Sequence, residues 1–167
     1  MSDFEIRKLI ESDAEIYRDI RLEMLEKHPE SFGEKFSNAA EQDIDFYKGR
    51  INNGVIYGAF KGGKLTAVAG HFVLPENAYN HKAMIWGVYV QPKNRGNKLG
   101  EALIQENLNC CEQYVEQVLL RVSAENKPAI GAYKNLGFKE YGREPQSRKI
   151  DNNYVDELSM VKFLNEK

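Results

Sequence analysis

The amino-acid sequence predicts an α/β fold of the α+β kind, with a single mixed, mostly antiparallel sheet of about six or seven strands flanked by about four helices. Strand-like and helix-like apolar patterns follow one another along the chain in the order β, α, α, β, β, β, α, β, α, β, β. No Pro/Gly/Ser-rich linker and no repeat divides the 167 residues. A chain of this length buries a substantial core without disulfides, so we expect one domain over residues 1–167.

The N-terminal part predicts one strand and two helices. Phe4 to Ile10 alternates apolar and polar residues, as a half-buried strand does. Ser12 and Glu15 match a capping box, which starts a helix that Pro29 should end. After a loop, the apolar spacing over Ala40 to Ile51 predicts a short second helix.

The middle of the chain predicts three strands. Val55 to Phe60 and Leu65 to Leu74 flank Lys61-Gly62-Gly63-Lys64, a natural hairpin turn, and Met84 to Val90 forms the third strand. The turn also completes the pattern G-x-x-x-x-G-K of nucleotide-binding phosphate loops. However, Leu65 stands where a magnesium-binding Ser or Thr is required, and a strand follows instead of a helix. This pattern therefore does not predict a nucleotide site.

The C-terminal part predicts a helix, a strand, a helix and a hairpin. Apolar residues from Leu99 to Val115 mark a helix of about five turns, and Val118 to Val122 is a short strand. Asn126 is a suitable cap for the next helix, which Leu136-Gly137-Phe138 should end. The residues from Gln146 to Leu164 predict a closing hairpin.

Composition excludes several classes of protein. With 23 basic and 25 acidic residues, a pI near 6.0 and no basic run, bulk electrostatic binding to nucleic acid or to a membrane surface is not expected. Cys110 and Cys111 are adjacent within a helical pattern, so we expect reduced helix residues. The longest apolar run, Leu65 to Leu74, is too short to span a bilayer, and the first residues do not match a secretion signal, so we expect a soluble, cytoplasmic protein.

The segment Val88 to Leu103 is the most informative part of the chain. A strand leads through a basic loop into a helix start, where unpaired backbone N–H groups and the helix dipole favour an anion. The loop combines cations with glycines that allow close backbone approach: Lys93, Arg95, Gly96, Lys98 and Gly100. On this segment alone, an ordinary strand-to-helix turn that contains glycine remains an alternative.

The stretch Arg95-Gly96-Asn97-Lys98-Leu99-Gly100 resembles the acetyl-CoA loop of the GNAT superfamily of N-acetyltransferases, (Q/R)-x-x-G-x-(G/A). Lys98 stands where the family usually has glycine; it is compatible with the loop if its φ is helical. A second block, Asn126 to Phe138, is similar to the family pattern N-x-x-A-x-x-x-Y-x-x-x-G-F. The resemblance extends over the chain in element order and implies a GNAT-like acyl-CoA N-acyltransferase fold with acetyl-CoA (CoA) as cosubstrate.

The resemblance also implies a set of cosubstrate-binding residues. The backbone of Val88 and Val90 would pair with the pantetheine amides like an added strand, and a backbone N–H of this strand would stabilise the oxyanion. Asn126 would hydrogen-bond the pantetheine arm. The implied set is Val88, Tyr89, Val90, Arg95, Gly96, Asn97, Lys98, Leu99, Gly100, Glu101, Asn126 and Tyr133.

Tyr133 is the catalytic residue that the resemblance implies, close to the thioester sulfur. A phenol, with a pKa of about 10, can donate a proton or a hydrogen bond to the departing thiolate. Periodicity alone would favour simple packing of this side chain in the helix. No metal is expected, because the reaction needs none and the three histidines show no ligand spacing with one another or with the cysteines: His28, His71 and His81.

The base that deprotonates the amine is left open between four residues and ordered water; the residues are Glu34, His71, Tyr89 and Glu157. The acceptor pocket should involve the loop Pro29 to Lys35, the strand near Trp86 and the closing hairpin. Its aromatic and acidic residues would suit a cationic amine, although aromatic residues of a small domain are usually core: Phe32, Glu34, Trp86, Tyr154, Asp156 and Glu157.

The leading functional hypothesis is an acetyl-CoA-dependent N-acetyltransferase that acts on a primary amine of a small molecule by direct attack in a ternary complex. Acetylation of a protein N-terminus or lysine is the alternative within this class. Family members that resemble the ribosomal-protein N-terminal acetyltransferases have glutamate five residues before Asn126, where this chain has Arg121. A non-catalytic acyl-CoA sensor is a further alternative, against which Asn126 and Tyr133 argue. Homodimers are common in such families.

Overall fold

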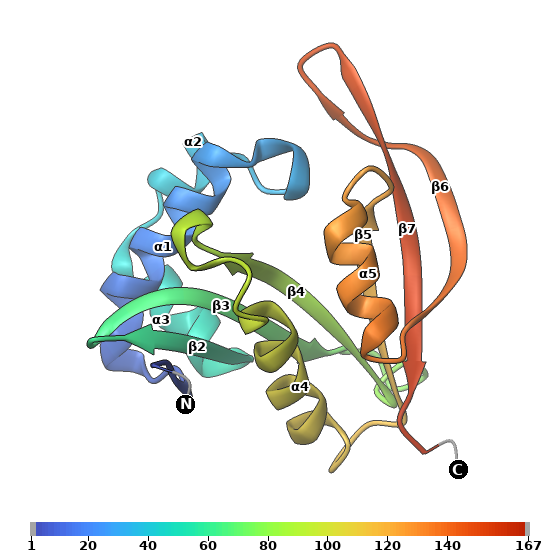
Figure 1. The fold of residues 1–167 in the computed structure, drawn as a ribbon, viewed down its shortest axis with the longest axis horizontal. Helices are drawn as coiled ribbons and strands as arrows, with labels where there is room; N and C mark the ends of the chain where they lie inside the picture. Colours follow the sequence, from blue (N-terminus) through green and yellow to red (C-terminus); the bar gives the residue numbers. More distant parts are fainter. Residues whose placement is uncertain (1–2, 166–167) are drawn as a thin grey trace.

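A seven-stranded sheet with the order β1-β2-β3-β4-β5-β7-β6 organises the computed structural model, which describes residues 3–165 (Figure 1). All neighbouring strands are antiparallel except β4 and β5. Because parallel neighbours need a crossover, α4 connects β4 to β5. The strands are β1 (Glu5–Lys8), β2 (Val55–Lys61), β3 (Lys64–Val73), β4 (Lys82–Val90), β5 (Gln117–Ser123), β6 (Lys139–Ile150) and β7 (Asn153–Phe163).

Helices cover both faces of the sheet. Along β3, Ala67 and Ala69 belong to the core under α4 and α5, whereas Val68 belongs to the core under α1 and α3. Because successive side chains of a strand point to opposite faces, the two cores lie on opposite sides of the sheet. The helices are α1 (Ala14–Lys27), α2 (Phe36–Ala40), α3 (Ile44–Asn53), α4 (Leu99–Cys111) and α5 (Lys127–Asn135), with 3-10 turns η1 (Glu11–Asp13), η2 (Pro29–Ser31) and η3 (Pro92–Asn94).

The predicted fold class is therefore confirmed, with seven strands and five α-helices in place of about four. The phosphate-loop-like pattern forms the β2–β3 turn, in which Gly62 and Gly63 have φ values of 55° and 76°. Positive φ is readily adopted by glycine, which explains the two residues without a nucleotide.

The start of α1 differs from the sequence prediction. A capping box of Ser12 and Glu15 is wrong, because a 3-10 turn precedes the helix. Asp13 stabilises this turn and makes no capping bond to α1: the Ile10 N–H donates to its carboxylate at 2.8 Å, and Arg7 donates to the same carboxylate at 2.7 and 2.9 Å. The helix ends at Lys27, as the following proline predicts.

The second helix begins later than predicted, and α2 occupies part of the predicted loop. Asp43 fixes the start of α3, because its side chain accepts a hydrogen bond from the Phe46 N–H at 3.0 Å. The helix α4 is also shorter than five turns. It ends at Cys111, whose carbonyl accepts bonds from Tyr114 and Val115 at 3.0 and 2.9 Å, so Val115 is buried in a turn instead of a helix.

The edge strand β6 begins at Lys139, seven residues earlier than the predicted start of the hairpin. Most of its residues are exposed and polar, and its pairing with β7 is interrupted twice, between Glu140 and Gly142 and between Glu144 and Arg148. The strand therefore lacks the apolar alternation from which a strand is recognised.

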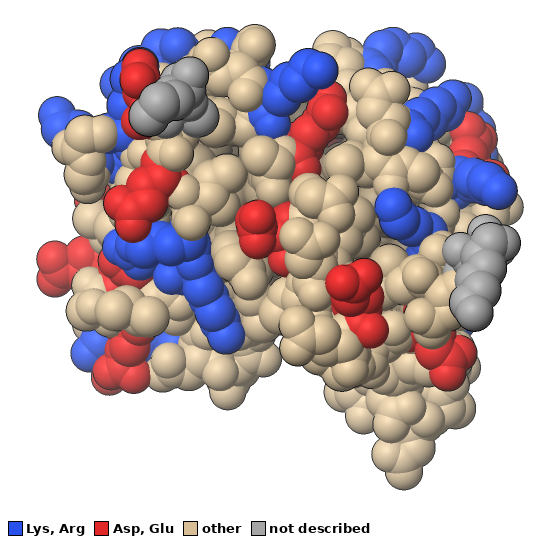
Figure 2. All heavy atoms as spheres, turned by 60° about the horizontal axis from the view of Figure 1, so that its bottom comes forward, with Lys and Arg blue, Asp and Glu red and all other residues tan. Residues whose placement is uncertain are grey.

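The surface carries both signs of charge. In Figure 2, Lys and Arg side chains are interspersed with Asp and Glu, and no large area of this face has a single sign. Among the helices of residues 3–165, none is long and apolar enough to cross a membrane.

Candidate active site

The parallel strands β4 and β5 pair only over Lys82–Met84 and Gln117–Leu119, and then diverge (Figure 1). A cavity of about 660 Å³ lies where they separate. Its wall includes β4 from Ile85 to Val90, β5 from Leu120 to Ser123, the first turn of α4 and the inner side of α5. The backbone edge of β4 beyond Met84 therefore faces a cavity instead of a strand.

A β-bulge interrupts β4 inside this cavity. Register passes from Val68 opposite Tyr89 to Gly70 opposite Trp86, so Gly87 and Val88 together oppose one residue of β3. Gly87 has a φ of 61°, and a Cβ at this position would lie 3.1 Å from Arg21 Nη1. Glycine thus satisfies both the backbone and the space. A bulge breaks the ladder, and here it leaves the β4 backbone available to a group in the cavity.

The loop before α4 has the geometry of an anion site. Gly96 has a φ of 82°, and α4 begins without a side-chain cap at Lys98. By contrast, α3 and α5 are capped by Asp43 and Asn126. The first N–H groups of α4, like those of α1 and α2, therefore lack a side-chain cap, and they lie at the cavity, at the end where the helix dipole favours an anion.

Lys98 adopts a left-handed conformation with φ 55° and ψ 25°. The condition under which lysine is compatible with the loop, a helical φ, is therefore not met by an ordinary right-handed φ. A side chain costs about 1 kcal/mol or more in this region, whereas glycine adopts it freely. The left-handed backbone explains why the GNAT pattern usually has glycine where this chain has Lys98, and a contact with phosphate is not needed to explain it.

Almost all the predicted cosubstrate residues lie on the cavity wall; they are Val88, Tyr89, Val90, Arg95, Gly96, Lys98, Leu99, Gly100, Glu101, Asn126 and Tyr133. Asn97 does not line it, and its Nδ2 donates to the Asn94 carbonyl at 3.0 Å. Asn126 caps α5 by accepting from the Ala129 N–H at 3.3 Å. Arg95 donates from Nε to the Val90 carbonyl at 3.1 Å.

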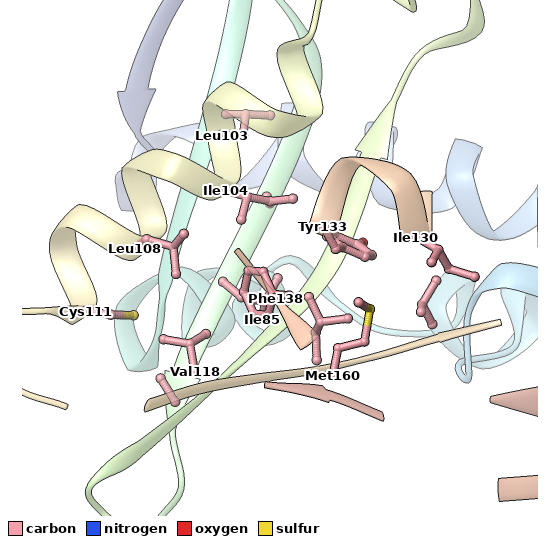
Figure 3. Packing of buried hydrophobic residues seen from close by; sticks show 14 of the residues in the cluster. Ile85, Leu103, Ile104, Leu108, Cys111, Val118, Ile130, Tyr133, Phe138 and Met160 are labelled. Atoms are coloured by element: carbon pink, nitrogen blue, oxygen red, sulfur yellow. The ribbon is translucent and has the colours of Figure 1, made fainter. Parts of the chain in front are cut away.

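Tyr133 belongs both to the core and to the cavity wall. It projects from α5 among buried residues that include Phe138 and Met160 (Figure 3), and its side chain is 7% exposed. Its hydroxyl has no hydrogen-bond partner within residues 3–165. Burial raises the pKa of Tyr133 to about 12, so the phenol keeps its proton at neutral pH. It is thus a free hydrogen-bond donor beside the cavity.

Residues 15–138 match the acetyltransferase (GNAT) family. The chain belongs to the GNAT family. It is therefore an acyltransferase of the acetyl-CoA-dependent N-acetyltransferase class, as the two sequence blocks predict.

Two curated GNAT relatives are similar in sequence. The chain is 27% identical over 128 residues to a Bacillus subtilis protein provisionally named a ribosomal protein bS18-alanine N-acetyltransferase, with 75% of this chain and 81% of the relative covered. It is 25% identical over 99 residues to the Escherichia coli L-amino acid N-acetyltransferase AaaT, with 57% of this chain and 61% of the relative covered.

Solved GNAT structures share the fold. A Streptococcus pneumoniae acetyltransferase superposes with a TM-score of 0.87 at 17% identity, covering 97% of this chain and 99% of its own. The phosphinothricin acetyltransferase of Sinorhizobium meliloti, solved in complex with AcCoA, has a TM-score of 0.83 at 19% identity, covering 98% and 89%.

A GNAT reaction needs the amine deprotonated, and two of the four predicted bases are held in ion pairs away from the cavity wall. Glu34 accepts hydrogen bonds from Arg21 at 2.7 Å and Arg50 at 3.1 Å. Burial would raise the pKa of Glu34, but the two arginines outweigh it and lower it. Glu157 pairs with Arg148 at 2.7 Å and with Arg121 at 3.1 Å.

The other two predicted bases are also unsuited. His71 borders a separate cavity of about 270 Å³, where it bonds to Asn107 at 2.6 Å and to Tyr114, and burial lowers its pKa. Tyr89 lines the main cavity but donates to Glu23 at 2.9 Å. Burial and this carboxylate raise the pKa of Tyr89, so its hydroxyl is not a base at neutral pH.

The acceptor end differs from the predicted cationic-amine pocket. Trp86 and Phe32 do line the cavity, but two guanidinium groups, of Arg21 and Arg50, lie 5.2 Å from the Trp86 ring centroid. The predicted hairpin residues do not reach the wall: Asp156 pairs with Arg143, and Tyr154 is 54% exposed.

The wall also contains residues that sequence reasoning did not assign to it. His28 follows α1 and faces the cavity, and Arg121 and Ser123 face it from β5, whereas Glu30 and Ser31 belong to the loop that the sequence does predict for the acceptor pocket. The histidine was considered only as a metal ligand. Within residues 3–165, no three His, Cys, Asp or Glu side chains are grouped so that they could hold one metal ion. Only the spatial arrangement of α1 beside β4 brings His28 to the site.

Proposed function

We propose that the chain transfers the acetyl group of acetyl-CoA to the primary amine of a small molecule, by direct attack within a ternary complex. The observation that carries the proposal is the cavity between β4 and β5, which combines an open strand edge, an uncapped helix start and a free phenol. Pantetheine would extend along Val88 and Val90, and the diphosphate would lie against the N-terminus of α4 beside Arg95 and Gly96.

The chemistry follows from these positions. The neutral amine attacks the thioester carbon, and the oxyanion accepts hydrogen bonds from backbone N–H groups of the bulge at Gly87 and Val88. The C–S bond then breaks, and the thiolate accepts a hydrogen bond from Tyr133. Because the pKa of Tyr133 is about 12, stabilisation of the thiolate by hydrogen bonding is favoured over complete proton transfer.

A small acceptor is favoured by the restricted acceptor end. Arg148 of β6 donates to the Glu30 carbonyl of η2 at 2.7 Å, which ties the two sides together. Such a bridge narrows the opening, so a small amine fits there more easily than a folded protein substrate. Arg121, which lies on the cavity wall, also stands where members that resemble the ribosomal-protein acetyltransferases have glutamate. The name of AaaT supports L-amino acids as a first group to test.

Acetylation of a protein N-terminus is the second candidate, because the Bacillus subtilis relative is named for the alanine of a ribosomal protein. An acyl-CoA sensor without turnover would not require a free phenol beside the thioester. The hydroxyl of Tyr133, which has no partner within residues 3–165, therefore favours catalysis over sensing.

The test has two steps. Calorimetry with CoA and acetyl-CoA, with ATP-magnesium as control, should show binding of the CoA pair alone. Release of CoA thiol is then measured with the twenty L-amino acids, putrescine and a peptide with N-terminal alanine. Turnover of amino acids or putrescine supports the proposal, turnover of the peptide alone supports the second candidate, and binding without any thiol release supports the sensor.

A further inference from the structure

His28 lies on the cavity wall beside Arg95. It follows α1 directly, and its backbone N–H donates to the Met24 carbonyl at 3.0 Å. Its ring lines the wall, with Nε2 3.1 Å from Arg95 Nη2 and Nδ1 3.5 Å from Glu30 Oε1. The side chain is 27% exposed, so the imidazole is in contact with solvent.

The contacts define which ring nitrogen can accept a proton. A guanidinium only donates hydrogen bonds, so Nε2 of His28 must be the unprotonated nitrogen in its contact with Arg95. The N–H is then on Nδ1, towards Glu30. The Glu30 carboxylate lies on this side, 3.5 Å from Nδ1. His28 is therefore arranged as a base whose accepting nitrogen is covered by an arginine.

The same arginine covers a second group that the proposed reaction uses. Arg95 Nε donates to the Val90 carbonyl at 3.1 Å, which is part of the strand edge assigned to pantetheine. A diphosphate offers the guanidinium charge-assisted hydrogen bonds, which are roughly twice as strong as bonds to neutral acceptors. Binding of the cosubstrate would thus draw Arg95 away from both Val90 and His28.

We propose that His28 accepts the proton that the acceptor ammonium loses, directly or through one water, and that Arg95 uncovers His28 Nε2 only when the diphosphate of acetyl-CoA is bound. This inference rests on the proposed function. It makes cosubstrate binding a condition for activation of the amine.

The proton balance is complete without a further reactant. The ammonium gives its first proton to His28 Nε2, and the neutral amine attacks the thioester. The zwitterionic intermediate gives its second proton to water, and the departing thiolate, which accepts a hydrogen bond from Tyr133, takes up a proton from water. His28 returns its proton to solvent. The products are the amide, CoA thiol and one released proton.

The surroundings of His28 are few enough to name. Arg95 approaches it from the loop before α4 and Glu30 from η2, while the Tyr89 ring of β4 lies 5.8 Å from its ring centroid. The Tyr89 hydroxyl is turned to Glu23, so it does not compete for the imidazole. Arg148 contacts the Glu30 carbonyl and leaves the carboxylate to His28.

The first experiment replaces His28 with glutamine, which can still accept from Arg95 but cannot take up a proton. With the most active amine of the panel, H28Q should lower kcat about 100-fold at pH 7. The pH profile of kcat should differ between H28Q and wild type, while the Kd for acetyl-CoA stays within threefold. His81→Gln, at the β3–β4 connection, is the matched control and should change neither quantity. A normal kcat or an unchanged pH profile in H28Q overturns the proposal.

The second experiment needs no acceptor amine. In protein with ¹⁵N-labelled histidine, saturating CoA should shift the Nε2 resonance of His28, because the bond from Arg95 is lost, and leave that of His81 in place. Pantetheine, the thiol arm of CoA without the diphosphate, should produce no such shift. An unchanged His28 resonance in the CoA complex refutes the role of Arg95. If calorimetry shows no CoA binding at all, the proposed function itself fails, which is a distinct result.

Discussion

The end of the cavity that we propose for the cosubstrate (the cosubstrate end) and the end that we propose for the acceptor (the acceptor end) differ in composition. The cosubstrate end consists mainly of backbone: the open edge of β4, its bulge at Gly87 and the uncapped start of α4. At the acceptor end the wall carries side chains such as Phe32 and Trp86, and the Trp86 ring lies against Arg21 and Arg50, which both pair with Glu34. Backbone groups keep the same chemistry whatever the sequence, so the first end can be shared across a family. The second end changes with each side chain, and it is there that acceptor specificity can differ.

The largest effect is expected from Glu34→Gln at the acceptor end. Arg21, which is 5% exposed, would lose its charged partner, and an uncompensated buried charge costs about 3 kcal/mol. Urea unfolding measures this loss. The control Glu144→Gln removes an exposed partner of Arg121 and should cost under about 1 kcal/mol. Equal costs for the two variants would mean that the acceptor end is not held together by this pair.

The next effect tests the cosubstrate end. Tyr133→Phe removes only the hydroxyl, so kcat should fall about 10- to 100-fold. The Kd for acetyl-CoA, measured by calorimetry, should change less than threefold, because the phenol acts on the departing sulfur. Tyr141→Phe on the exposed edge strand is a matched control. An undiminished kcat would mean that Tyr133 only packs in the core and does not act on the thiolate.

A smaller effect is expected from Lys98→Gly. The left-handed backbone at this position strains lysine and suits glycine, so the variant should gain about 1 kcal/mol in free energy of unfolding. Thermal or urea unfolding without ligand measures the gain. If stability falls instead, the lysine side chain makes a contribution larger than its backbone strain.

The smallest effect concerns acid stability. The folded-state pKa of Glu34 is lowered, so its contribution is complete above its unfolded value of about 4.3 and is lost as pH falls through the folded value. Unfolding free energy measured from pH 6 to pH 3 should therefore decline less steeply in Glu34→Gln than in wild type. Parallel curves for the two proteins would contradict this assignment.

The sequence predicted what depends on neighbours along the chain. The loop Arg95 to Gly100 and the cap at Asn126 are local features, and both lie at the cavity. The starts of α1 and β6 were misplaced, because a 3-10 turn and an exposed bulged strand leave no apolar period. His28 was not found as a site residue, because only packing of α1 against β4 brings it beside Arg95. The pairing of Glu34 and Glu157 with arginines is likewise tertiary, so the sequence could not tell a free carboxylate from a bound one.

The divergence of β4 and β5 also has a consequence for the lifetime of the protein in a cell. A cosubstrate that completes the open strand edge would be a structural part of the sheet as well as a reactant. A ligand that binds only the folded state at 100 times its Kd adds about 2.7 kcal/mol to stability, which lowers the unfolded population about 100-fold. Exposure of the chain to proteases would then follow the supply of acetyl-CoA, and starvation for the acetyl donor would remove idle enzyme without any dedicated signal.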